Sequence, residues 1–190
     1  NLGSTGVINN DATVDADPDN LASFPVVIKD CRIELTSANP AGSTGIYTSG
    51  SDLRIERSEI IVSGSSTNNY AISATSGAGD LIILDSQIYA AGANSYAVVD
   101  QQSGETRISN SILNGGSYAI SKVTGPAIIR SSYLLSASVC ARAVSSNAVK
   151  IAATTFDCTT HRQELSSGDV ICVNSNDENA AELDSDCAIL

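Results

Sequence analysis

The chain has no methionine or tryptophan and few other aromatic residues, with two phenylalanines and six tyrosines among 190 residues. Large flat side chains therefore cannot fill its core. The 42% hydrophobic content comes mainly from Ala, Val, Ile and Leu, and such small and β-branched residues favour thin, regularly stacked strands. A chain of this length and apolar content can bury the core of one domain.

Basic residues are also scarce. The 10 Lys and Arg face 21 Asp and Glu, which gives a formal charge of -11 at pH 7 and a pI near 4.2. Nucleic acids and anionic membranes recruit proteins through positive potential, so the sequence predicts neither as a partner. No run of about 18 apolar residues is present, and the sequence therefore predicts no membrane-spanning helix.

No cationic segment followed by an apolar stretch marks a signal peptide in the given sequence. The chain begins at Asn1 rather than at Met, so we expect a processed secreted chain or a piece of a larger one. Its richness in Ser, Thr, Asn and Gly is typical of extracellular or cell-surface proteins.

One short pattern recurs along most of the chain. It reads Ile, two residues, a small residue, one residue, then an aliphatic residue or Phe. In residues 81–88, Leu81 and Ile83 share one alternating phase, whereas Ser86 and Ile88 share another that is offset by three. Such a step predicts a strand, a sharp bend and a second strand. The six copies are Ile28/Cys31/Ile33, Ile55/Ser58/Ile60, Ile83/Ser86/Ile88, Ile108/Ser111/Leu113, Ile129/Ser132/Leu134 and Ile151/Thr154/Phe156.

A second element follows each copy and predicts a third strand. Repeats of 21 to 28 residues with three short strands indicate an all-β fold, a single-stranded parallel β-helix of six to eight coils. An antiparallel sandwich would need tight hairpins, and only Asn114-Gly115 provides that signal. The first Ile of each copy should form one buried stack. The third-strand copies are Tyr70-Ala71-Ile72, Tyr96-Ala97-Val98 and Tyr118-Ala119-Ile120, with looser versions at Gly45-Ile46 and Cys140-Ala141.

The sequence divides into three parts. Residues 1–25 form an arm or degenerate first coil, in which Gly6-Val7-Ile8 resembles Gly45-Ile46-Tyr47. Residues 26–158 form the β-helix. Residues 159–190 supply a strand at 170–173, a short helical turn at 179–183 and a cap that covers the open end of the last coil.

Five cysteines leave at least one thiol free or paired between molecules. Cys31 occupies a buried small-residue position of the repeat, which predicts a free core thiol, and Cys140 takes a similar interior position. The other three crowd the C-terminal part, where a disulfide would stabilise an end without a neighbour. We favour Cys158 with Cys172, although the connectivity of Cys31, Cys140, Cys158, Cys172 and Cys187 stays open.

The repeated Ile-x-x-Ser-x-Ile followed by Tyr-Ala-Ile resembles the right-handed parallel β-helix proteins of the pectate-lyase-like superfamily. The resemblance covers residues 26–158 and implies the right-handed sense of the coil. That superfamily includes polysaccharide lyases and hydrolases, phage tail spikes, adhesins and other surface proteins, so the resemblance implies a fold without a function.

The residues that carry chemistry in that superfamily are poorly matched. Its hydrolases use clustered Asp residues with Gly-His-Gly and Arg-x-Lys, whereas the single histidine here, His161, lies between Thr160 and Arg162 and is predicted to be exposed. Its lyases use calcium-binding carboxylates and an Arg that removes a proton. Arg57 and Arg130 occupy related positions, and Asp30, Glu56 and Asp85 lie near the same bend. Mixed charges there predict a solvated ladder, so we assign no catalytic, cofactor-binding or metal-binding residue and expect no cofactor.

Two other features could bind a ligand. The run Asp15-Ala16-Asp17-Pro18-Asp19-Asn20 resembles the start of a calcium loop, but position twelve is Val26 rather than Glu, which favours a solvated acidic arm. The tyrosine ladder would suit sugars if it faced outward. Tyr70 shares its phase with Ile72, which predicts that the ladder is buried.

The sequence therefore predicts a non-enzymatic extracellular structural or adhesive β-solenoid, a segment or subunit of a surface fibre, filament or spike. Variable loops at 63–69 and 91–95 would bind a surface glycan or protein, and rods could join end to end through residues 1–25. The alternative is a carbohydrate-active enzyme, a polysaccharide lyase or hydrolase, or a non-catalytic glycan-binding module. The ligand, the oligomeric state and the parent assembly stay open.

Overall fold

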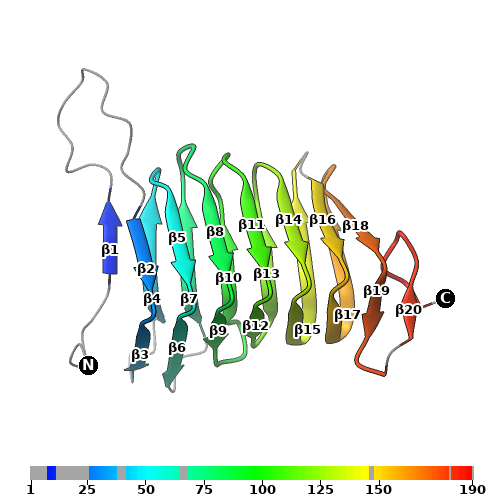
Figure 1. The fold of residues 1–190 in the computed structure, drawn as a ribbon, viewed down its shortest axis with the longest axis horizontal. Helices are drawn as coiled ribbons and strands as arrows, with labels where there is room; N and C mark the ends of the chain where they lie inside the picture. The colour runs from blue at the N-terminus through cyan, green and yellow to red at the C-terminus, as the bar shows by residue number, and fades with distance from the viewer. Residues whose placement is uncertain are drawn as a thin grey trace.

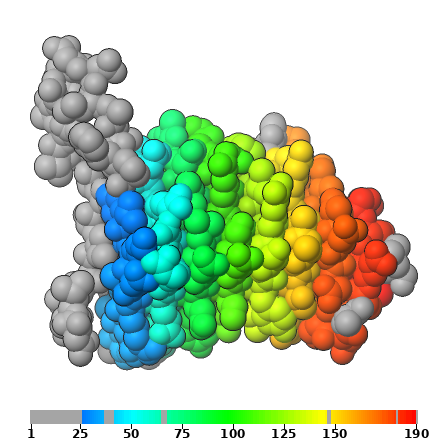
Figure 2. Space-filling model, viewed as in Figure 1, coloured from blue at the N-terminus to red at the C-terminus, as the bar shows by residue number. Residues whose placement is uncertain are grey.

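The computed structural model describes residues 8–11, 26–37, 42–64, 68–145, 148–179 and 181–189. Within these ranges the chain is all-β, without a helix, and forms a parallel β-solenoid of about six turns (Figure 1). The coils stack into one continuous body whose colour runs from blue to red along its long axis (Figure 2). The predicted parallel β-helix is confirmed. The described part contains no helix long and apolar enough to cross a bilayer.

The first strand of every coil belongs to one seven-stranded parallel sheet. Each of these strands is short because the bend that follows ends it after four or five residues. In the order of the coils they are β2 (Val26–Lys29), β5 (Leu53–Glu56), β8 (Leu81–Leu84), β11 (Thr106–Ser109), β14 (Ala127–Arg130), β16 (Ala148–Ala152) and β18 (Asp169–Val173).

The second and third strands of the coils form a 13-stranded sheet that wraps around the rest of the solenoid. Two long strands, β15 (Tyr133–Val144) and β17 (Thr155–Leu165), run through the corner that separates the second and third strands elsewhere. The second strands are β3 (Arg32–Ser37), β6 (Glu59–Gly64), β9 (Gln87–Ala90) and β12 (Ile112–Gly115), and the third are β1 (Ile8–Asp11), β4 (Ser43–Ser49), β7 (Asn69–Thr75), β10 (Tyr96–Asp100) and β13 (Tyr118–Lys122).

Equivalent residues of successive coils pair directly and form the core. The first Ile of every repeat pairs with its counterpart in the next coil, as predicted, and Cys172 extends this row into β18. From Ile55 to Ile151 these side chains have no exposed surface. Alternation places every second residue inside, so the solenoid buries a ladder of aliphatic side chains along its length.

A charged pair is also buried. The Lys122 ammonium lies 2.8 Å from the Asp100 carboxylate, and neither side chain is exposed. Lys122 also donates to the carbonyl oxygens of Gln102 and Gly104, at 3.1 and 3.0 Å. Asp100 accepts hydrogen bonds from the Gln102 backbone N–H and the Thr106 hydroxyl. Burial lowers the pKa of Lys122, and the charge of Asp100 opposes that shift.

The two ends of the solenoid differ. At the N-terminal end β1 pairs in parallel with β4, and Ile8 lies opposite Ile46, one residue away from the predicted alignment. At the C-terminal end the predicted strand at 170–173 is present as β18. The helical turn predicted at 179–183 is wrong: β19 (Ser175–Asp177) pairs antiparallel with β20 (Glu182–Leu183). Leu183 in turn bridges Ile189, so the last residues fold back over the final coil.

The cysteine predictions need two corrections. The disulfides are Cys140–Cys158 and Cys172–Cys187, not Cys158–Cys172. Cys140 and Cys158 lie on the adjacent strands β15 and β17, with 5.8 Å between their Cα atoms, a separation that a disulfide requires. Cys187 ties the C-terminal segment to β18. Two disulfides indicate an oxidising environment.

Cys31 is free, as predicted, but it is exposed rather than in the core. It lies in the first complete coil, and no described residue of a preceding coil covers its repeat position. We therefore expect iodoacetamide to add one label per native, unreduced chain, and peptide mass spectrometry to place that label on Cys31. Labels on Cys140 or Cys187 would contradict the two disulfides.

Candidate functional site

The candidate site lies at the bend between the first and second strands of the coils. One residue at this bend has a positive φ in every coil, which turns the chain sharply enough to start the second strand in a new direction. Asp and Asn tolerate this conformation better than most side chains, and they occupy four of the seven positions. The bend residues and their φ angles are Asp30 (53°), Arg57 (43°), Asp85 (50°), Asn110 (50°), Ser131 (49°), Ala153 (49°) and Asn174 (48°).

A ladder of hydroxyl groups follows the bend. The Ser58 hydroxyl donates to the Glu56 carbonyl oxygen at 2.8 Å and accepts the Cys31 N–H at 3.1 Å. The Ser86 hydroxyl repeats both bonds one coil later. Each hydroxyl thus satisfies a carbonyl of its own bend and an N–H of the preceding coil. We call this row the hydroxyl ladder: Ser58, Ser86, Ser111, Ser132, Thr154 and Ser175.

The hydroxyl ladder explains why the small residue of the repeat is mostly Ser or Thr rather than alanine, which would also fit. We expect Ser86→Ala to lower the free energy of unfolding by about 1–3 kcal/mol, since it leaves the buried Ser58 N–H without its acceptor. Ser109→Ala, on the outer face of the neighbouring strand, is the matched control and should change stability by less than about 0.5 kcal/mol. Urea denaturation measures both; equal values would mean that the ladder does not stabilise the stack.

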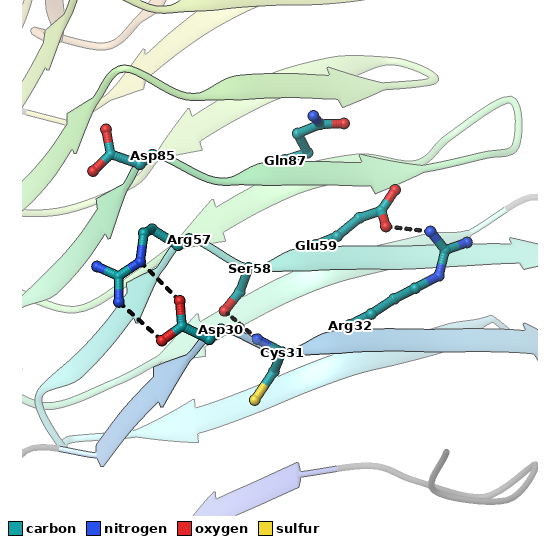
Figure 3. Close-up of a pocket in the computed structure, with 8 residues that line it drawn as sticks. All are labelled: Asp30, Cys31, Arg32, Arg57, Ser58, Glu59, Asp85 and Gln87. Atoms are coloured by element: carbon teal, nitrogen blue, oxygen red, sulfur yellow. Dashed lines mark hydrogen bonds and ion pairs between the residues drawn. The ribbon is translucent and has the colours of Figure 1, made fainter.

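An open groove of about 570 Å³ lies over the first three bends, between their polar side chains (Figure 3). Arg57 reaches back across one coil and binds Asp30 with two nitrogens, at 2.7 and 2.9 Å. This pairing lowers the pKa of Asp30 and raises that of Arg57. At the far end of the groove Arg32 pairs with Glu59 of the next coil and with Glu34 of its own strand.

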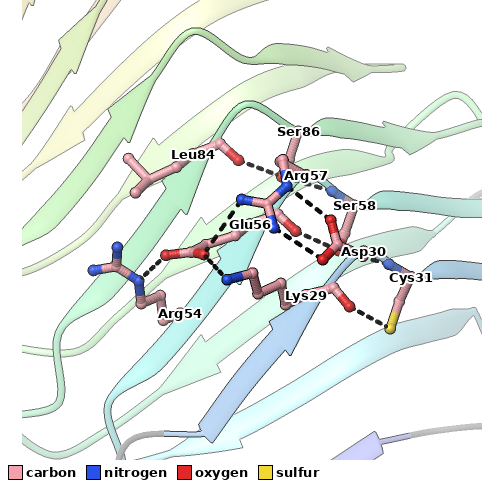
Figure 4. Close-up of polar contacts among 9 residues, drawn as sticks. All are labelled: Lys29, Asp30, Cys31, Arg54, Glu56, Arg57, Ser58, Leu84 and Ser86. Carbon is pink, nitrogen blue, oxygen red and sulfur yellow. Dashed lines mark hydrogen bonds and ion pairs between the residues drawn. The ribbon is translucent and has the colours of Figure 1, made fainter.

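Glu56 is the centre of the charges beside this groove (Figure 4). It pairs with Arg54 on its own strand and with Lys29 of the preceding coil, the latter at 3.6 Å. A guanidinium nitrogen of Arg57 lies 3.9 Å from the same Glu56 oxygen that Lys29 contacts. The hydrogen bond from Arg54 is the main reason why the pKa of Glu56 is lowered. Each of these cations already forms an ion pair with a carboxylate, and these pairs stabilise the stacking of neighbouring coils.

The structure brings together most of the residues considered for a lyase site, but not all. Asp30, Arg57 and Asp85 line the groove, and Glu56 lies beside it. Arg130 is not equivalent to Arg57: it is in register with Ser109, in the row that contains Glu56 and lies one residue before the bend. Within the described ranges no group of three or more His, Cys, Asp or Glu side chains could hold a metal ion.

The tyrosine ladder faces outward, contrary to the prediction. Tyr70, Tyr96 and Tyr118 stack with centroids 5.4 and 4.7 Å apart, but all three are only half-buried. The residues after Tyr70, Ala71 and Ile72, are both fully buried. Two consecutive inward residues break the alternation, so Tyr70 and Ile72 do not share a face. Because the rings cover each other, they present mainly edges rather than faces to a ligand.

The remaining candidates stabilise the fold or lie outside the residues that the structure describes. His161 is half-buried rather than exposed; its Nδ1 donates to the Cys187 carbonyl oxygen at 2.8 Å, so it fastens the C-terminal cap. In the loop at 91–95, Ala93 and Asn94 are exposed, whereas Ser95 is buried and accepts the Asn69 N–H. The calcium-like run at 15–20 and the centre of the 63–69 loop lie outside the described residues.

The buried pair of Asp100 and Lys122 is absent from the predictions above, although the sequence carries a signal for it. Both residues follow the repeated tyrosine by four positions, Tyr96 in one case and Tyr118 in the other. Opposite charges at one repeat position predict a contact between adjacent coils, and the register confirms it. Comparisons of the chain with protein-family models, with curated proteins and with solved structures found no match.

Proposed function

We propose that the chain is a non-enzymatic, extracellular structural β-solenoid, a segment or subunit of a surface fibre, filament or spike. The observation that supports this most is the use of its polar side chains. Arg57, Glu56 and the hydroxyl ladder, which occupy the candidate site, are engaged in contacts within and between coils. Their chemistry stiffens a stack rather than preparing an acid, a base or a nucleophile.

The ends of the solenoid support self-association. In the described part of the chain β2 and β3 are the last strands of their sheets, and such edges offer unpaired backbone groups to another chain. The opposite end is covered by β20 and the disulfide-tied segment to Ile189. Unlike ends favour head-to-tail contacts over symmetric ones, and head-to-tail contacts can continue into filaments.

Negative-stain electron microscopy and sedimentation velocity of the purified chain test the proposal. We expect filaments or concentration-dependent oligomers. A chain that stays monomeric up to millimolar concentration would contradict it.

An assay with a panel of polyuronates, read by the absorbance of unsaturated products and by reducing ends, tests the enzymatic alternative. We expect no turnover. Turnover that disappears in Arg57→Lys would instead identify a lyase at the groove, while retention on immobilised glycans without turnover would identify a binding module.

A further inference from the structure

The outer face of the seven-stranded sheet changes character along the solenoid. In its N-terminal half each cation is paired: Lys29 and Arg54 with Glu56, and Arg107 with Glu105. In its C-terminal half Arg130 and Lys150 are both exposed, and no described acidic residue forms an ion pair with either. Two unpaired cations are unusual on a chain with a net charge of -11.

These two cations border an apolar groove of about 410 Å³ on strands β14, β16 and β18. Ile128, Ile171 and Val173 line it, and Val173 leaves 52% of its surface exposed. The strands lie side by side in Figure 1, and their surface is coloured from yellow to orange in Figure 2. An apolar floor with unpaired positive charges at its edge suits a segment that carries both acidic and apolar side chains.

Residues 12–25 have this composition. Asp15, Asp17 and Asp19 alternate along the chain, and Leu21 and Phe24 follow them. In an extended segment alternate residues share one side and lie about 6.6 Å apart. Lys150 is in register with Ile128, two residues from Arg130 on the adjacent parallel strand, so the Cα atoms of the two cations lie roughly 8 Å apart along a diagonal. Two successive aspartates of the segment therefore match their spacing.

The length of the segment decides which molecule it comes from. Its 14 residues connect Asp11, the last residue of β1, to Val26, the first residue of β2. Half of such a loop, fully stretched, spans at most about 25 Å. The groove lies four to six coil steps from β2, or about 19–29 Å along the axis. Within one molecule the loop would have to be taut and could not lie along the groove, whereas a second copy stacked head to tail brings its own loop to this end.

We propose that the groove between β14 and β18 binds residues 12–25 of a second copy of the chain, with the aspartates on Arg130 and Lys150 and the apolar side chains on Ile171 and Val173. This inference rests on the proposed self-associating function and names its contact surface. It also explains how rods can join although the C-terminal cap covers the strand edges of the last coil: the contact runs along the side of the sheet.

A labelled peptide of residues 12–25 tests the contact directly, by fluorescence anisotropy against the native chain. We expect Arg130→Glu/Lys150→Glu to weaken peptide binding at least tenfold. The matched control is Arg54→Glu/Arg107→Glu, which makes the same charge change on the same face outside the groove and should bind like the native chain. A peptide with Asn in place of its three aspartates should not bind. Equal binding to both double variants would overturn the inference.

A charge exchange tests the assembly by sedimentation velocity. The groove variant Arg130→Glu/Lys150→Glu and the arm variant Asp15→Lys/Asp17→Lys/Asp19→Lys should each be monomeric, because groove and arm then carry the same sign. Mixed in equal amounts, they should associate again. If the native chain associates and the groove variant does so equally, the inference fails while the proposed function stands. If the native chain never associates, the proposed function fails. The peptide assay then decides by itself whether the groove binds residues 12–25.

Discussion

Replacing Lys122 with alanine should lower the free energy of unfolding by about 3–5 kcal/mol. The Asp100 carboxylate would then stay fully buried without its cation, and only the Gln102 N–H and the Thr106 hydroxyl would still donate to it. Removing one partner of a buried ion pair is costly because the remaining charge stays out of water without an opposite charge to compensate it. Urea denaturation followed by circular dichroism measures the change.

Lys29→Ala is the matched control, because it removes the same charge from an ion pair whose lysine is half exposed. Its expected cost is below about 1 kcal/mol. The double variant Asp100→Asn/Lys122→Met should recover most of the lost stability, since no charge stays buried, the amide oxygen still accepts from the Gln102 N–H, and the amide NH2 donates to the Thr106 hydroxyl oxygen. A Lys122→Ala chain as stable as the Lys29→Ala chain would show that the pair is not buried as described.

Replacing Ile108 with alanine should cost about 2–5 kcal/mol. Ile108 has no exposed surface and lies in register between Ile83 and Ile129, so the shorter side chain would leave a cavity in the middle of the aliphatic ladder. The regular backbone pairing above and below prevents the neighbouring coils from closing that cavity, because they cannot approach without breaking their hydrogen bonds.

The control for this cavity is Ile112→Ala in the same coil. Ile112 is 41% exposed, and its replacement should cost less than about 1 kcal/mol. The same urea experiment compares the two variants, and the difference between them measures burial alone because the chemical change is identical. Similar losses at both positions would contradict the inward and outward assignment of this coil.

Several details of the fold depended on contacts that no local pattern carries. The Cys140–Cys158 disulfide joins neighbouring coils, and the sequence could not reveal it because β15 continues through a corner that other coils interrupt with a loop. The tyrosines face outward because two consecutive residues, Ala71 and Ile72, are buried, whereas the repeat pattern predicts unbroken alternation. The exposure of Cys31 depended on its place in the first complete coil, since the repeat treats every coil as if it had two neighbours.

The architecture could be predicted from residue spacing alone: a parallel β-solenoid with three strands per coil, a bend before each small residue and one aliphatic stack. This is possible because each coil repeats the same local rule and pairs with the next, so periodicity along the chain becomes proximity in space. Which charged side chains pair with each other became clear only from the folded coils. Arg57 forms an ion pair with Asp30, and Lys122 with Asp100, whereas no described acidic residue pairs with Arg130 or Lys150. Such partnerships depend on distances of a few ångströms between side chains of different coils, and residue spacing does not encode those distances.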